Sequence, residues 1–178
     1  MATKRPFKPS GSLRGMLFNA LRFEAGWLLC VLGGSWVAAA TGAVLLSWHA
    51  WRCARPGEWR FIAVFALLGL ILDGGFHLAG GFDFHDDTLI AGLLPVWLWM
   101  LWPLFATLVF HSLAWLWRYP LIAAACGAVS GPLSYLGGAA LAGVTLAPWL
   151  LPAQAVAWGA LCWGISTYMR RYRADIVG

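Results

Sequence analysis

The feature that most constrains this chain is a series of apolar runs, each about 20 residues long and separated from the next by a short polar linker. A run of that length is what an α-helix needs to cross the ~30 Å hydrocarbon core of a bilayer. Soluble domains have roughly a quarter of their residues charged, whereas 11% are charged here and 61% are hydrophobic. A soluble helical fold would leave too much apolar surface in water. The sequence therefore predicts an integral membrane protein.

The apolar runs predict an all-α bundle of six transmembrane helices, which forms one integral membrane domain over 1–178 with cytoplasmic tails at 1–15 and 169–178. The expected spans are 16–34, 36–54, 60–80, 91–112, 119–142 and 147–168. The first two could instead be one long helix from Ala25 to Trp48. Paired glycines favour a turn over a helix interior, so the Gly-Gly-Ser stretch at 33–35 indicates a break.

The basic residues support six spans and set their orientation. With the N-terminus inside, every Lys and Arg except Arg22 falls on one side of the membrane: Lys4, Arg5, Lys8, Arg14, Arg52, Arg55, Arg60, Arg118, Arg170, Arg171 and Arg173. The other side holds Asp83, Asp86 and Asp87 and no basic residue. This positive-inside pattern predicts both termini in the cytoplasm, and it is lost in a five-span arrangement. The net charge of +5 then indicates contact with anionic lipid headgroups rather than with nucleic acid.

The fifth run carries small residues at helical spacing. Gly127 and Gly131 form a GxxxG pair, which lets helix backbones pack closely in lipid. A second ladder of small residues follows on an adjacent face: Ser130, Ser134, Gly138 and Ala142. Pro132 lies mid-run, and a kink there could instead open a polar cavity. Three tryptophans of the fourth run either face lipid, pack against helices or line such a pocket: Trp97, Trp99 and Trp102.

Two ionisable residues stand at the outer end of the third run. Asp73 and His77 are four residues apart, so they share a helix face. A carboxylate at that depth needs a partner, a proton or water. Counting ~1.5 Å per residue brings Ser134, Tyr135 and Gln154 to a similar depth. The pattern predicts either an interhelical clamp around Asp73, or a catalytic site in which Asp73 and His77 form an acid–base pair and Tyr135 donates to a substrate.

A second polar layer lies towards the cytoplasmic side. Its members come from the first, second and fourth runs: Asn19, Arg22, Glu24, Ser47, His49, His111 and Ser112. Arg22 is expected to extend to the headgroups, whereas Glu24 lies deeper and is expected to meet His49 or His111. Across both layers, the candidate binding residues are Glu24, His49, Trp99, Trp102, His111, Ser112, Ser134 and Gln154.

Neither a metal nor a cofactor is expected from the motifs. Asp73 and His77 offer at most two ligands, and the histidines show no tight ligand spacing. The four cysteines form no CxxC pair. The sequence has no Walker loop, GxGxxG, HExxH or serine elbow.

Five stretches carry a family resemblance: NALRFEAGW from Asn19, LGLILD ending at Asp73, PVW from Pro95, LWPLFATLVFHSLAWL from Leu101 and GAVSGPLSYLGG from Gly127. The sequence resembles domain of unknown function 2878, a family of small bacterial inner-membrane proteins without an established activity. The resemblance implies a multi-pass protein of the bacterial inner membrane. The sequence departs from the family pattern at Glu24, where an uncharged amide is more frequent. It places five residues at family motif positions: Asp73, His111, Ser112, Ser134 and Tyr135.

Three functions remain open, and only one of them is an enzyme. The preferred one is a membrane-embedded enzyme or accessory factor acting on a lipid or other apolar substrate, because buried polar groups lie beside an aromatic wall. A small proton-coupled transporter is the second, since intramembrane carboxylates and a mid-span proline suit it. The third is a structural or assembly subunit, whose small-residue ladders would bind a membrane-protein partner or a second copy.

Overall fold

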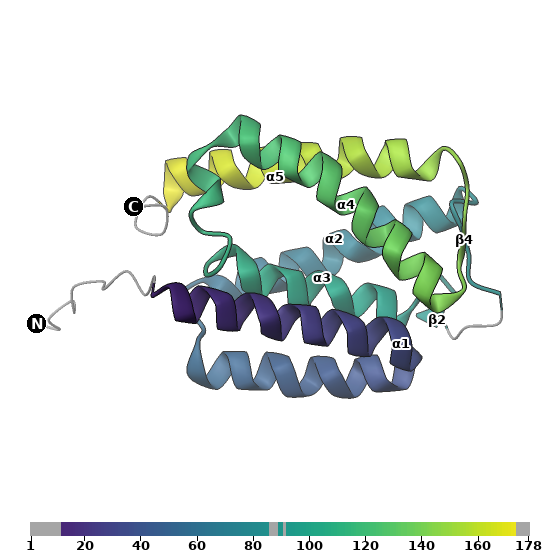
Figure 1. Ribbon diagram of the computed structural model, residues 1–178, viewed down its shortest axis with the longest axis horizontal. Helices are drawn as coiled ribbons and strands as arrows, with labels where there is room; N and C mark the ends of the chain where they lie inside the picture. Colours follow the sequence, from purple (N-terminus) through teal and green to yellow (C-terminus); the bar gives the residue numbers. More distant parts are fainter. Residues whose placement is uncertain (1–11, 86–88, 91, 174–178) are drawn as a thin grey trace, which may run out of the picture.

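The computed structural model describes residues 12–85, 89–90 and 92–173 (Figure 1). In chain order, its elements are α1 (Leu13–Arg52), α2 (Glu58–Leu78), β1 (Phe82–Asp83), β2 (Leu89–Ile90), β3 (Leu94–Pro95), α3 (Val96–Val109), η1 (Leu116–Arg118), α4 (Pro120–Ala142), β4 (Thr145–Leu146) and α5 (Leu150–Tyr172). The all-α class is confirmed, since each strand has only two residues. Three helices, α1, α2 and α4, are long and apolar enough to cross a membrane, which indicates a membrane protein.

Element α1 is a hairpin of two helices rather than a straight rod. At Gly34 the backbone has φ 69° and ψ −170°, a conformation that is essentially restricted to glycine. Contacts across the turn are antiparallel, because the Phe18 ring lies 5.7 Å from that of Trp48 while Arg22 reaches His49. The two arms run side by side in Figure 1. The break predicted at 33–35 is therefore confirmed.

Helix α3 is shorter than the span predicted over 91–112. It has 14 residues, which at ~1.5 Å each give about 21 Å, less than the ~30 Å core. Before it, the chain forms a strand pair in which Leu89 faces Pro95 and Ile90 faces Leu94. After it, the chain turns and buries Trp117, whose indole Nε1 donates to the Val109 carbonyl at 2.8 Å. These tertiary contacts end the helix at positions where the sequence remains apolar.

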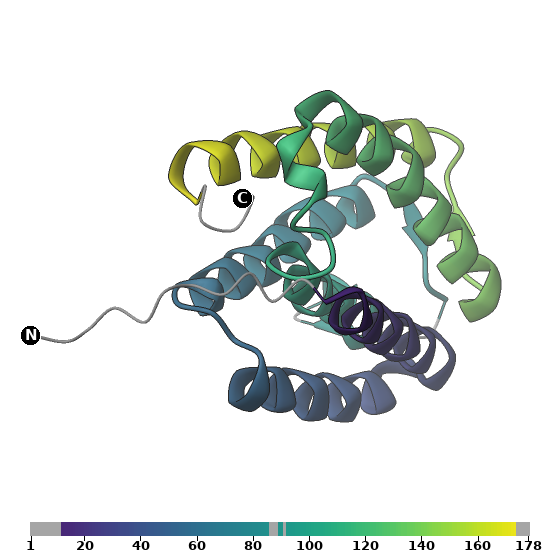
Figure 2. The same cartoon turned by 60° about the vertical axis from the view of Figure 1, so that its left-hand side comes forward.

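The helices form two layers, seen from the side in Figure 2. In the first layer α3 packs against α1 and α2, and in the second α4 packs against α5. The glycines of the predicted GxxxG pair make this second contact. A Cβ at Gly127 would lie 2.6 Å from the Cys162 Sγ, and one at Gly131 would lie 2.5 Å from the Trp158 ring. The prediction that these glycines pack helices together is confirmed.

Each end of the molecule ties the two layers together. At one end β1 pairs with β4, with Phe82 opposite Leu146 and Asp83 opposite Thr145. At the other end η1 packs against α5, and the Ser166 hydroxyl donates to the Trp117 carbonyl at 2.6 Å. In Figure 1 α1 begins and α5 finishes at this second end, on the left, whereas β4 lies at the right. Several charges used to predict orientation lie outside the described residues: Lys4, Arg5, Lys8, Asp86 and Asp87.

Candidate functional site

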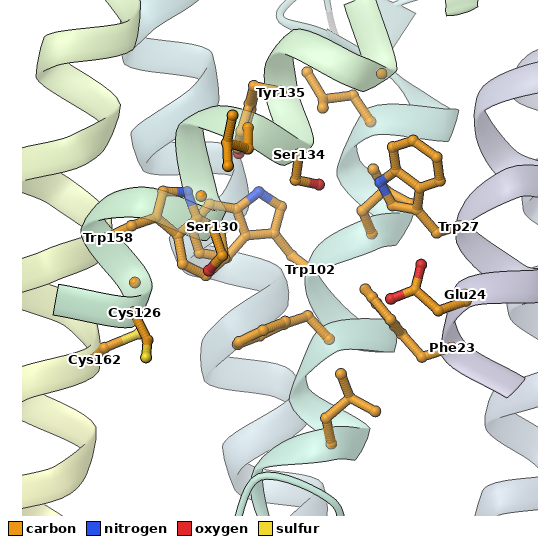
Figure 3. Close-up of a pocket in the computed structure, with 18 of the residues that line it drawn as sticks. Phe23, Glu24, Trp27, Trp102, Cys126, Ser130, Ser134, Tyr135, Trp158 and Cys162 are labelled. Carbon is orange, nitrogen blue, oxygen red and sulfur yellow. The ribbon is translucent and has the colours of Figure 1, made fainter. Parts of the chain in front are cut away.

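A cavity of about 620 Å³ lies between the two layers, bounded by α1 and α3 on one side and by α4 on the other (Figure 3). Its walls are mostly aromatic and aliphatic. Four of its residues carry hydroxyl or carboxyl groups: Glu24, Ser130, Ser134 and Tyr135. Because Glu24, Ser130, Leu133 and Ser134 are exposed as well as lining it, the cavity opens to the outside between α1 and α4. Beside the opening, the outer faces of α1 and α4 carry exposed apolar side chains such as Leu28 and Val129.

Asp73 lies behind the cavity wall and is fully buried. Trp102 Nε1 donates to one carboxylate oxygen at 2.7 Å, and the Tyr135 hydroxyl lies 2.8 Å from each oxygen. These bonds join α2, α3 and α4, so Asp73 links both layers. Tyr135 was a predicted partner of Asp73, whereas Trp102 was expected to face lipid, to pack against helices or to line a pocket. Both side chains also line the cavity, and they separate Asp73 from it.

Gln154, Ser134 and His77 were also predicted to lie near Asp73, and the structure places each of them differently. Gln154 is buried beside Asp73 in a small void, but its Nε2 has no hydrogen-bond partner among the described residues. Ser134 faces the main cavity instead (Figure 3). His77 is not brought to the carboxylate. Its Nδ1 lies 3.3 Å from the Phe82 carbonyl and its ring lies against Phe84, one turn further towards the end with the β1–β4 pair.

The second polar layer is built around Glu58, a carboxylate that sequence reasoning missed. Its Oε1 lies 2.8 Å from His49 Nε2 and 3.2 Å from His111 Nε2, and its Oε2 accepts from the Arg55 backbone N–H at 2.8 Å. Arg22 completes the network, with Nη2 3.0 Å from His49 Nδ1. Glu58 and His49 are both fully buried.

Two expectations about this layer are wrong. Glu24 is not the partner of His49 or His111, since it points into the cavity (Figure 3). Arg22 does not extend to the headgroups, since it binds His49 and its guanidinium lies 4.6 Å from the Trp48 ring centre. The physical reason is that a buried carboxylate at the start of α2 attracts the histidines. Glu58 lies within the arginine-rich stretch 52–60, so the sequence alone predicts a solvated residue outside the membrane.

Three side chains of this network have the composition of a metal site. The ligand atoms of His49, Glu58 and His111 lie within 4.8 Å of one another. A metal-bound histidine normally donates its other ring N–H to an acceptor. Arginine can only donate, so His49 Nδ1 accepts from Arg22 and His49 Nε2 carries the proton directed at Glu58. The geometry is therefore that of a hydrogen-bonded charge network, and a metal ion could bind only if Arg22 left His49.

The remaining candidates hold α3 in place. Ser112 donates through its hydroxyl to Asn19 Oδ1 at 2.8 Å, which attaches the end of α3 to the first arm of α1. Trp99 Nε1 donates to the Ala66 carbonyl at 2.8 Å and so packs α3 on α2. Neither Trp99 nor Ser112 lines the cavity. Their contacts are those of interhelical clamps.

The segment that follows α2 carries a local hydrogen-bonded pair, Asp83 and His85. The His85 backbone N–H and ring Nδ1 each lie 3.0 Å from Asp83 Oδ1. These bonds, the backbone one first, lower the pKa of Asp83. Both residues are exposed, so the pair belongs to the aqueous end of the molecule rather than to the cavity.

Comparison with known proteins identifies one family. The sequence profile of the family described as "Protein of unknown function (DUF2878)" matches residues 16–165. The chain belongs to this family. The resemblance found in the sequence is thereby confirmed.

The DUF2878 match runs from the first turn of α1 into α5, so it includes every residue of both polar layers. Searches of curated proteins and of solved structures find no match. The family description assigns no activity, so a function for this DUF2878 protein has to be argued from the cavity and its polar groups.

Proposed function

We propose that this chain is a six-span protein of the bacterial inner membrane that takes a lipid or other apolar molecule from the bilayer into its cavity and acts on it. The observation that carries the proposal is the cavity itself. Its volume of about 620 Å³ is within the ~300–1,000 Å³ typical of ligand sites, and such sites are mostly apolar with a few convergent polar groups. Its opening between α1 and α4 gives a molecule in the bilayer direct access.

The charge distribution supports an orientation with both termini in the cytoplasm. Among the described residues, every arginine except Arg22 lies in the first or last turn of a helix or outside the helices: Arg14, Arg52, Arg55, Arg60, Arg118, Arg170, Arg171 and Arg173. They cluster at the end where α1 begins and α5 finishes, while Asp83 lies in the β1–β4 pair at the other end (Figure 1). The positive-inside rule puts the basic end in the cytoplasm.

The reactive group of the proposed site is the Tyr135–Asp73 pair. Tyr135 lines the cavity and donates to Asp73, which is shielded from it. A ligand oxygen beside Tyr135 would exchange a proton with the phenol, and Asp73 would hold the proton behind it, as in general acid–base catalysis. His77 has no part in this pair, because its ring is directed at Phe82 and Phe84.

A small proton-coupled transporter is the second candidate. It is favoured by Glu24, a carboxylate in a membrane cavity, because intramembrane acids commonly mark ion or substrate pathways. A structural subunit has less support. Of the two small-residue ladders that would serve as its partner interface, the Gly127 and Gly131 pair is already covered by Trp158 and Cys162 of α5.

The experiment is to fill the cavity and to measure what the purified protein retains. Ser130→Trp adds a large side chain to the cavity wall, whereas Val129→Trp adds the same side chain on the outer surface of α4, where Val129 is 61% exposed. Native mass spectrometry of gently purified protein should show a bound apolar molecule in the unchanged chain and in Val129→Trp, and its loss in Ser130→Trp. Equal retention by both variants would overturn the proposal.

A further inference from the structure

The ionisable lining of the cavity is acidic and carries no basic group. Glu24 supplies a carboxylate, and no Lys, Arg or His is among the described residues that line the cavity. The nearest arginine in sequence, Arg22, binds His49 on another face of α1. Asp73, the next carboxylate, is enclosed behind Tyr135 and Trp102. A bound molecule therefore meets a negative potential and no cation.

Glu24 is also exposed rather than enclosed. Its side chain points into the cavity beside Trp27 (Figure 3). Within the described residues it has neither a hydrogen bond nor an ion pair, in contrast to Glu58, which accepts from two histidines and a backbone amide. A carboxylate at bilayer depth is costly unless it is protonated or paired with a cation. No described residue supplies the cation that would pair with Glu24, so a bound molecule could supply it.

The rest of the wall suits a cation too. Phe23 and Trp27 lie beside Glu24, and Trp102 and Trp158 line the opposite side of the same cavity (Figure 3). The faces of such rings attract organic cations, and walls of several aromatic side chains are a recurring way to bind alkylammonium groups. Fatty acids and phospholipid phosphates would meet the Glu24 carboxylate with a like charge instead.

We propose that the cavity binds a lipophilic cation, an organic ammonium group with an apolar body, whose positive charge pairs with Glu24 between the aromatic walls. This inference rests on the proposed function, since it names the chemical class of the molecule that the cavity takes. It applies equally to an enzyme and to a transporter.

The test uses three photoactivatable alkyl probes of one chain length, with a trimethylammonium, a hydroxyl or a carboxylate head. Each is added to the full chain in vesicles of zwitterionic lipid, and labelled peptides are identified by mass spectrometry. The ammonium probe should label the cavity-lining parts of α1 and α4 about tenfold more than the alcohol, a difference that corresponds to one ion pair of ~1.4 kcal/mol. The carboxylate probe should label them least.

Two variants isolate the charge. Glu24→Gln keeps the size of the side chain and should reduce ammonium labelling to the level of the alcohol, while Glu24→Asp should keep most of the preference. Both variants should unfold at the same temperature as the unchanged chain, which would show that the fold is intact. Labelling of the cavity by all three probes alike, or a preference for the carboxylate, would overturn the cation assignment and leave cavity binding intact. If no probe labels the cavity above the exposed outer face of α4, the proposed function fails as well.

Discussion

At the residue scale, the carboxylates of α1 and α2, which are Glu24, Glu58 and Asp73, have two kinds of environment. Asp73 and Glu58 are fully buried and hydrogen-bonded, whereas Glu24 is exposed in a cavity. Buried charges persist only when they are paired, and removal of one partner leaves an uncompensated group. Asp73 and Glu58 therefore hold helices together whatever else they do. Glu24 contributes nothing comparable to the fold, which makes it the carboxylate available to a ligand.

Tyr135→Phe tests the clamp around Asp73. The change removes one of the two side chains that donate to a fully buried carboxylate, and an unmade bond to a buried polar group costs about 1–3 kcal/mol. Thermal unfolding in detergent should show a loss of that size. Tyr172→Phe is the control, because Tyr172 is 63% exposed, and it should leave stability unchanged. Equal effects of the two substitutions would contradict the clamp.

Glu58→Gln tests the second network. Arg22, His49 and His111 surround this carboxylate, and neutralising one member of a buried charge network is expected to lower the free energy of unfolding by up to about 3–5 kcal/mol. The amount of protein in the membrane and its unfolding temperature should both fall. Glu24→Gln is the matched control, because it is the same chemical change at an exposed position. A Glu58→Gln protein as stable as Glu24→Gln would show that the network is not structural.

Unfolding with added zinc tests whether His49, Glu58 and His111 can bind a metal ion. Because Arg22 occupies His49 Nδ1, added zinc is expected to leave the unfolding temperature of the unchanged protein where it is. Replacing Arg22 by Met releases that nitrogen while keeping an apolar stem of similar length. A rise in unfolding temperature with zinc in the unchanged chain would refute the tautomer assigned to His49.

Hydrogen-bond partners could be predicted from the sequence where depth along a helix decides them. They could not be predicted where the fold brings distant segments together. Tyr135 was found because it lies at the depth of Asp73. Glu58 was missed because the adjacent residues 52–60 are rich in arginine and resemble an aqueous linker. The fold brings it beneath His49 and His111, a contact between segments 9 and 53 residues apart. No local pattern encodes such a contact.

At the element scale, helix boundaries depend on single residues and on tertiary contacts to different degrees. The turn in α1 follows from Gly34, and its position was predictable because glycine pairs disfavour helix. The short α3 was not predictable from apolar length. Its ends are set by the β2–β3 pair and by the burial of Trp117, which local hydrophobicity does not reveal.

Gly34→Ala tests the hairpin. The residue has φ 69°, and a side chain in such a conformation costs about 1–3 kcal/mol. Membrane abundance and unfolding temperature should fall, although nothing lies within 4 Å of the added methyl group. Gly164→Ala is the control, since its position in α5 also has open space and the helix suits alanine. If the two variants behave alike, the backbone conformation of Gly34 is not the constraint.

At the scale of the whole molecule, the two layers are joined at the ends by strands and loops and in the interior by Asp73 and the Trp102–Trp158 ring stack, and they leave a cavity beside these contacts. This division explains how a small chain can provide both a stable fold and an open site. The α4–α5 pair needs no gap because its glycines allow close contact. Between α1 and α4 the large Trp27 side chain lines the cavity and lies next to Gly138 of α4.

The proposed orientation has its own test. A reporter enzyme that is active only in the periplasm should be active when fused after Asp87 and inactive when fused after Gly178. A reporter that works only in the cytoplasm should give the reverse result at both points. Activity of the periplasmic reporter at Gly178 would contradict a cytoplasmic C-terminus and with it the six-span arrangement.

The division into layers also follows the order of synthesis. The ribosome completes α1 to α3 before α4 begins at Pro120, and folding during synthesis proceeds from the N-terminal part of a chain. The wall of the cavity formed by α1 and α3 therefore spends its first moments against lipid tails, without its opposite wall. When α4 and α5 arrive they close over whatever occupies that wall. A molecule dissolved in the bilayer can thus occupy the site while it is still being built, and it can later leave or enter through the opening between α1 and α4.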